Sequence, residues 1–232
     1  MKRPLLAAVA VALVVRVVHS RHQRFLHPDG RSFTGELIVW GSGRKEGADL
    51  LDRPGRHPAV VRISKGVGTR GERADIRGVA VRVAGERPLD LLMSTSGEGR
   101  FTRHLPAPRR TFDTFYGSIV AYRTGSERKI YLGARADEET PLGRDLAGLS
   151  GGALVLYADD RAFGRVTFGK QLPSRTDEEL AFDPVRNTTP DLHPTGTIHF
   201  TRALAYRVSQ RWRGVRPAAP APEAVERTGL HR

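Results

Sequence analysis

Short apolar runs separated by turn residues dominate the chain between about residues 33 and 182. From Ile76 to Ala84, for example, Val79, Val81 and Val83 occupy every second position. This period of two is typical of a strand that buries one face. Such runs predict strands at residues 33–40, 59–64, 76–84, 89–93, 153–158, 163–170 and 179–182.

The middle of the chain, from about residue 111 to residue 149, is less regular, and its apolar spacing predicts helical stretches such as Thr111–Tyr122. Four strands, a helical insert, further strands and a closing helix indicate an α+β fold. We expect an antiparallel β-barrel of about eight strands with helices packed outside it. The sequence shows no internal repeat.

A chain of 232 residues suits one domain with a substantial core. We expect an apolar N-terminal helix at residues 1–20, the barrel domain at 21–216, and a disordered Pro/Ala-rich tail at 217–232. The apolar run Leu5–Val15 is too short to span a bilayer. It favours a packing helix or a membrane-surface anchor, while its basic start leaves a signal peptide open.

Composition excludes some classes of site and partner. The chain has no cysteine, so it has no disulfide framework, no thiolate zinc site and no haem thioether attachment. Its net charge is +13, but the basic residues are spread along the chain and only five are lysine. This distribution indicates that the positive charge reflects an arginine-rich composition and not a binding site for a specific nucleic-acid partner. The chain is expected to be cytoplasmic or membrane-associated, or secreted if the N-terminus is a signal peptide; a homo-oligomer stays open.

One face of the predicted C-terminal helix combines a phenol with two guanidinium groups. At about 100° per residue, Arg202, Tyr206 and Arg213 fall within roughly 40° of one another. Leu204 and Trp212 belong to an apolar stripe on the opposite side. A tyrosine binds ferric iron as its phenolate, and a nearby cation favours that charged form. The alternative is a surface helix whose polar face happens to include a tyrosine.

Two further segments hold candidate polar groups. His27 precedes the first predicted strand, where it is either a functional group or an ordinary loop residue. In the second segment Arg62 and Ser64 share one face of a strand. If Val61 and Ile63 point into the barrel, Arg62 is expected to be solvated, which is the commoner arrangement. If Arg62 points inward, it needs a buried anion.

Taken in chain order, these segments resemble the catalase superfamily over about half of the chain. Its closing part looks like small bacterial catalase-like proteins, such as mini-catalases and catalase-related hydroperoxide-converting enzymes. The resemblance rests on Arg24-x2-His27, Val61-Arg62-Ile63-Ser64, Asp75-x-Arg77-Gly78-x-Ala80, Asp90-Leu91-Leu92 and Arg202-x3-Tyr206-x6-Arg213.

The resemblance implies haem b with its iron ligated by Tyr206, and a hydroperoxide as substrate. Tyr206 would be kept as phenolate by Arg202, while Arg24, Arg62 and Arg213 would bind the propionates. His27 would serve as the acid–base group, oriented by Ser64.

The sequence departs from the family at Ser94, which stands where catalases carry an asparagine, and it lacks the aromatic pair that follows. A serine hydroxyl has a shorter reach than an amide. The departure favours a peroxidase or an organic-hydroperoxide-converting activity over fast dismutation of hydrogen peroxide. Two alternatives stay open: a haem-binding or haem-sensing protein without turnover, and a haem-free barrel that binds lipids or small molecules.

Overall fold

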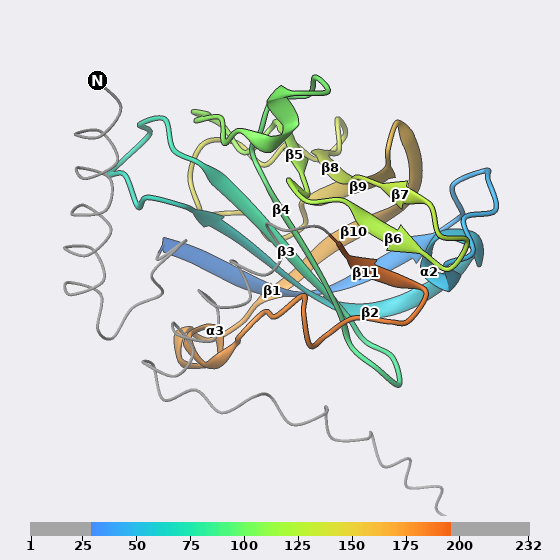
Figure 1. The fold of residues 1–232 in the computed structure, drawn as a ribbon. Helices are drawn as coiled ribbons and strands as arrows, with labels where there is room; N and C mark the ends of the chain where they lie inside the picture. Colours follow the sequence, from blue (N-terminus) through green and yellow to red (C-terminus); the bar gives the residue numbers. More distant parts are fainter. Residues whose placement is uncertain (1–28, 196–232) are drawn as a thin grey trace, which may run out of the picture.

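The computed structural model describes residues 29–195. Eight strands close into an antiparallel barrel with the order β1-β10-β9-β8-β5-β4-β3-β2 (Figure 1). The barrel strands are β1 (Asp29–Val39), β2 (Gly55–Lys65), β3 (Arg77–Val83), β4 (Leu89–Ser94), β5 (Phe115–Gly117), β8 (Leu132–Ala136), β9 (Ala153–Ala158) and β10 (Arg161–Gln171).

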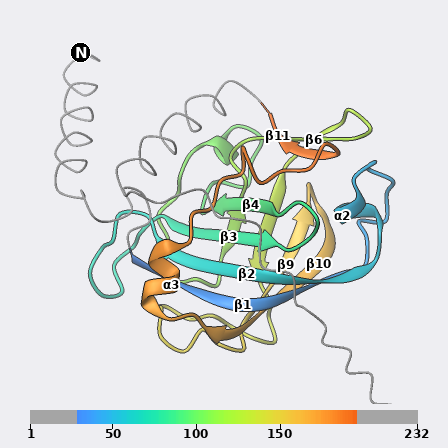
Figure 2. The same cartoon turned by 90° about the horizontal axis from the view of Figure 1, so that it is seen from below.

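A small second sheet and three short helical segments lie outside the barrel. The sheet has the order β11-β6-β7 and the helix α3 contacts β1 (Figure 2). None of the helices within residues 29–195 combines the length and apolar content needed to cross a membrane. These outer elements are β6 (Tyr122–Thr124), β7 (Lys129–Ile130), β11 (Leu192–Pro194), α2 (Asp49–Asp52), the 3₁₀ turn η1 (Thr102–His104) and α3 (Ser174–Glu179).

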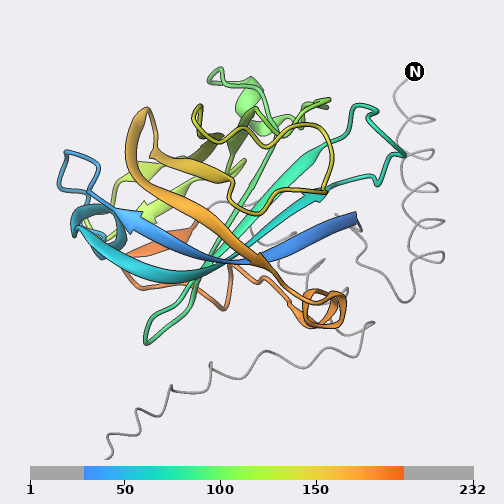
Figure 3. The same ribbon diagram turned by 180° about the vertical axis from the view of Figure 1, so that it is seen from behind.

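The barrel interior is built by the alternation that the sequence displays. Val79, Val81 and Val83 are buried in the core, and the residues between them face outward. Phe33 of β1 and Phe168 of β10 stack with ring centroids 5.7 Å apart, across the pair of long strands seen from behind in Figure 3. The barrel therefore closes around a single core with strands of three to eleven residues, the longest of which are β1, β2 and β10.

The barrel class and six of the seven predicted strands are confirmed. The prediction of a helical insert is wrong: Thr111–Tyr122 contains β5, and β6, β7 and β8 follow it. Tyr116 is buried in the core and Gly117 pairs with Ser94 of β4. The segment is rich in aromatic, Gly and Ser/Thr residues, which are weak helix formers, and pairing with β4 and β8 decides its structure.

The prediction of a strand at residues 179–182 is also wrong. Glu179 is the last residue of α3, and the chain then runs alongside the barrel without joining it. Arg82 Nη2 donates to the carbonyl of Ala181 at 2.6 Å, and the Asp183 amide donates to Asp90 Oδ2 at 2.7 Å. Side chains of β3 and β4 thus hold this segment. The predicted N-terminal helix, the tail and the outer limits of the barrel domain lie outside the described residues.

Candidate functional site

Small residues form a continuous row across the outer face of the barrel. Each member is the direct cross-strand partner of the next, so all of them project from the same side of the sheet. Neighbouring strands are about 4.8 Å apart, so the row extends over five such spacings. The row consists of Gly30, Ser64, Gly78, Ser94, Gly117 and Gly133.

The row is flat because none of its members carries an atom beyond a hydroxyl oxygen. Their chain neighbours, such as Val79, Met93 and Tyr116, occupy the core instead. Ser64 is buried and its Oγ lies 3.4 Å from the Gly78 carbonyl oxygen, whereas Ser94 is half-buried. Glycine in a strand interior weakens the strand and often marks a close approach by a ligand or another backbone.

Arg62 lies on the same outer face, two residues before Ser64 on β2. It is 5% exposed, and its Nε is 3.3 Å from Asp177 Oδ1 on α3. Asp177 also accepts a hydrogen bond from Ser32, the cross-strand partner of Arg62. Val61 and Ile63 do point into the barrel, but Arg62 is not solvated as that arrangement predicts, because α3 brings a carboxylate to the outer face.

Gly30 is required by the position of this arginine. A Cβ atom at residue 30 would overlap the Arg62 guanidinium group, which therefore lies directly against the Gly30 backbone. Gly30 is the cross-strand partner of Ser64. The β1 end of the row is consequently bordered by a buried cation.

Asp75 shapes the loop that follows β2. Its Oδ1 accepts the Val67 amide at 2.9 Å, and its Oδ2 accepts the Thr69 amide at 2.7 Å. Burial by itself raises the pKa of Asp75, but these hydrogen bonds outweigh it and hold the pKa below the ordinary 3.8. The ionised carboxylate therefore stabilises the loop beside the row.

Replacing Asp75 by asparagine is expected to lower the free energy of unfolding by about 1–3 kcal/mol at neutral pH. Because the folded pKa lies below the unfolded one, this contribution is present above pH 3.8 and is lost as pH falls through the folded pKa. Thermal unfolding of wild type and variant as a function of pH should therefore converge in acid. A constant difference down to the lowest pH would contradict the assignment, and the exposed Asp160→Asn serves as the control.

Arg77 and Tyr116 fix the segment that leads into β5 from inside the barrel. Arg77 is fully buried and donates to the carbonyls of Arg109 at 3.2 Å and Arg110 at 2.8 Å, with its guanidinium 4.0 Å from the Phe112 ring centroid. Burial lowers the Arg77 pKa, and burial raises the Tyr116 pKa. Tyr116 is thus a neutral phenol, which donates to the Phe112 carbonyl at 2.8 Å.

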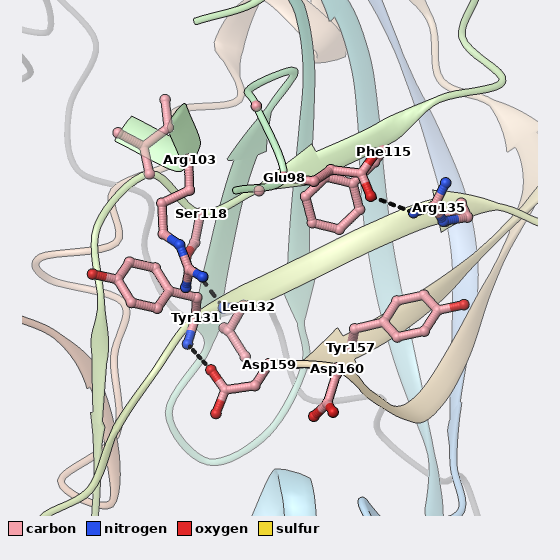
Figure 4. Close-up of a pocket in the computed structure, with 13 residues that line it drawn as sticks. Glu98, Arg103, Phe115, Ser118, Tyr131, Leu132, Arg135, Tyr157, Asp159 and Asp160 are labelled. Carbon is pink, nitrogen blue, oxygen red and sulfur yellow. Dashed lines mark hydrogen bonds and ion pairs between the residues drawn. The ribbon is translucent and has the colours of Figure 1, made fainter. Parts of the chain in front are cut away.

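A hollow of about 560 Å³ opens where the row reaches β5, β8 and β9. Gly117 and Tyr157 both line it, and Tyr157 is the cross-strand partner of Gly133 (Figure 4). Arg135 pairs with Glu98 at 2.9 Å, and the Tyr131 amide donates to Asp159 Oδ1 at 2.8 Å. The hollow is therefore lined by aromatic rings, by the Glu98–Arg135 ion pair and by further charged side chains.

The structure brings three of the predicted site residues to one face: Ser64 and Ser94 belong to the row, and Arg62 borders it. Within residues 29–195 no group of three His, Asp or Glu side chains is arranged to hold a metal ion. The other predicted residues, His27, Arg24, Arg202, Tyr206 and Arg213, lie outside the described residues.

Sequence reasoning missed Asp177, Gly117 and Gly133. Asp177 is one acidic residue in the polar stretch Ser174–Glu179, and nothing in that stretch identifies Arg62 as its partner. Gly117 and Gly133 did carry a signal, because glycine within a strand marks a close approach. The signal was hidden by the prediction of a helical insert there.

Comparison with known proteins relates this barrel to solved structures. No protein-family model matches the chain, and no curated protein sequence matches it. A fungal catalase crystal structure matches with a TM-score of 0.63 and 14% identity, over 86% of this chain and 61% of that one. Catalase A from Saccharomyces cerevisiae matches with a TM-score of 0.55 and 13% identity, over 82% of this chain and 61% of that one.

The fold is catalase-like. The predicted resemblance to the catalase superfamily is therefore confirmed for the architecture, although the chain spans only 61% of the length of these two catalases. At 13–14% identity the likeness extends to the barrel and does not carry residue roles.

Proposed function

We propose that this catalase-like protein binds haem b on the outer row, with Tyr206 as the iron ligand, and reacts with hydroperoxides. The observation that carries the proposal is the central part of the row, where Ser64, Gly78 and Ser94 lie side by side next to the buried Arg62. A broad planar group needs such a surface, since any larger side chain would lift it from the sheet.

The described residues fit a porphyrin at Arg62, whereas other side chains lie over the row at its β5–β8 end. A Cβ at Gly117 would lie 2.8 Å from Ser96 Oγ, and one at Gly133 would lie 2.8 Å from a carbon of the Phe115 ring, so Ser96 and Phe115 already lie over these two glycines. Arg62 suits a propionate because a guanidinium presents five N–H donors in a planar fork. Arg24 and Arg213 are proposed to bind the propionates with it, and Arg202 to favour the Tyr206 phenolate.

When bound, haem supplies the iron centre at which a peroxide O–O bond is cleaved. The chain's own contribution is proton transfer. His27 is proposed to accept the proton of the hydroperoxide O–H on an imidazole nitrogen and to return it to the departing oxygen, which leaves as a neutral alcohol or water. The sequence attaches His27 two residues before Asp29, at the end of β1 where Gly30 pairs with Ser64. Ser64 is proposed to orient the imidazole.

Ser94 supports an activity towards organic hydroperoxides. It is half-buried at the centre of the row, between Gly78 and Gly117, and offers a hydroxyl donor. The hollow beyond Gly117 provides about 560 Å³ for the organic part of such a substrate. Hydrogen peroxide would leave this space unused, which favours peroxidase or organic-hydroperoxide chemistry over dismutation.

Tyr206→Phe is expected to abolish stable haem binding, because phenylalanine has no oxygen to ligate iron. The measurement is a pyridine haemochrome assay on full-length protein expressed with added haem, with Tyr157→Phe as the matched control. Wild-type haem content in Tyr206→Phe would refute the ligand assignment. Haem loss in Tyr206→Phe with retention in Tyr157→Phe is the expected result.

The hollow also favours a second candidate, a haem-free barrel that binds a small organic molecule. It is lined by Phe115, Tyr131 and Tyr157 and does not depend on any cofactor. This candidate would be supported if the wild-type protein stays colourless after haem supply and binds cumene hydroperoxide or an organic dye without converting it. A Soret band would exclude it.

A further inference from the structure

The turn around η1 presents two large apolar side chains to solvent. Phe101 is 82% exposed and Leu105 is 61% exposed. Within residues 29–195 four large apolar residues are exposed, and the two most exposed of them lie four positions apart in this one segment. In Figure 1 the turn projects from the upper end of the barrel. We call residues 97–110 the η1 turn.

Phe101 and Leu105 belong to a segment that hydrogen bonds and ring contacts hold in place. The Gly97 amide donates to the Thr102 carbonyl at 3.2 Å, and the Leu105 amide donates to the same carbonyl at 2.9 Å. His104 Nδ1 lies 2.8 Å from the Ile119 carbonyl oxygen, and the Arg103 guanidinium lies 4.5 Å from the Tyr131 ring centroid. The turn is thus fastened at its base while its apolar tip is held outward, which reduces the ordering cost of binding.

The charge of the η1 turn is strongly positive. It contains four arginines, at positions 100, 103, 109 and 110, and one acidic residue, Glu98. Glu98 is neutralised by Arg135 at 2.9 Å. Among the ion pairs of residues 29–195, none involves the four arginines.

A neighbouring loop adds to the same charge. Asp75 and Arg109 pair through reciprocal backbone hydrogen bonds of 3.0 and 2.8 Å, so the loop between β2 and β3 lies beside the η1 turn. That loop exposes Arg70, Arg73 and Val67, and its Glu72 pairs with Arg144 at 3.3 Å. The end of the barrel therefore offers apolar tips surrounded by uncompensated guanidinium groups.

We propose that the η1 turn docks the protein reversibly on an anionic lipid membrane. Phe101 and Leu105 would enter the headgroup–acyl boundary while the arginines bind anionic headgroups. A neutral protein groove would match the apolar tips but not the arginines, and a nucleic acid would match the arginines but not the aliphatic Leu105. The proposed surface lies within the described residues and does not depend on haem.

The test is co-sedimentation of the full-length chain with phosphatidylcholine vesicles, with and without phosphatidylserine. Phe101→Ser/Leu105→Ser is expected to weaken binding to the anionic vesicles by about tenfold or more, since both apolar anchors are removed. Arg100→Gln/Arg110→Gln is expected to weaken it similarly. Because the N-terminal segment is unchanged in every variant, the differences report on the η1 turn.

The matched charge control is Arg44→Gln/Lys45→Gln, which removes two exposed charges from a loop between β1 and α2. It is expected to bind as the wild type does. Equal losses in both charge variants would show that binding follows net charge alone and would overturn the proposal. So would wild-type binding by Phe101→Ser/Leu105→Ser, or no preference of the wild type for anionic vesicles. Circular dichroism establishes that each variant is folded.

Discussion

Asp90→Ala is expected to lower the free energy of unfolding by about 3–5 kcal/mol. Asp90 is fully buried, and its two oxygens accept hydrogen bonds from Arg82 Nε and Nη2, both at 2.7 Å. Alanine would leave the Arg82 guanidinium, whose side chain is only 14% exposed, without its carboxylate. Breaking a buried pair costs far more than the pair contributes, because the remaining charge stays desolvated.

The same carboxylate holds the segment after α3. The Asp183 amide donates to Asp90 Oδ2 at 2.7 Å, and Asn187 Nδ2 donates to it at 2.8 Å. Asp90→Ala should therefore also release this segment from β4. Limited proteolysis is expected to cut the variant within residues 180–190 faster than the wild type.

Urea unfolding followed by far-UV circular dichroism measures the change in stability. The exposed Asp160→Ala is the control, and its expected change is within about 0.5 kcal/mol. A difference of less than about 1 kcal/mol between Asp90→Ala and the wild type would show that the Arg82–Asp90 pair is not a major support of the barrel.

Local patterns in the sequence predicted much of the barrel. The alternation of Val79, Val81 and Val83 identifies β3 and its inward face without further information. The strands of the insert were missed because β5 is only three residues long and is specified by its partners on β4 and β8. A pattern of period two cannot be recognised over so few residues.

In the candidate site, too, local motifs identify some residues while long-range contacts decide how they are placed. Short motifs indicate Arg62, Ser64 and Ser94, and the register of β2, β3 and β4 places these residues on one face. The burial of Arg62 could not be foreseen, because its partner Asp177 is 115 residues away in the sequence. The flatness of the row likewise depends on cross-strand register, which aligns Gly78 with Ser64 and Ser94.

His27→Ala is expected to keep haem content while lowering the rate of reaction with cumene hydroperoxide by about 10²–10⁴-fold, the usual contribution of a positioned acid–base group. Ser64→Ala, which removes the buried hydroxyl proposed to orient the imidazole, is expected to cost less. The measurement is the initial rate per bound haem as a function of pH. The wild type should show a limb near the ordinary histidine pKa of about 6.5, and His27→Ala should lack it.

The half-buried His57 on β2 provides the matched control, because it lies at the opposite end of that strand from Ser64. His57→Ala should retain both the rate and the pH limb. Unchanged rates in His27→Ala would show that another group moves the proton. Loss of the pH limb in Ser64→Ala with little loss of rate would instead show that the Ser64 hydroxyl sets the pKa of the titrating group. An imidazole that loses its hydrogen-bond partner changes its pKa.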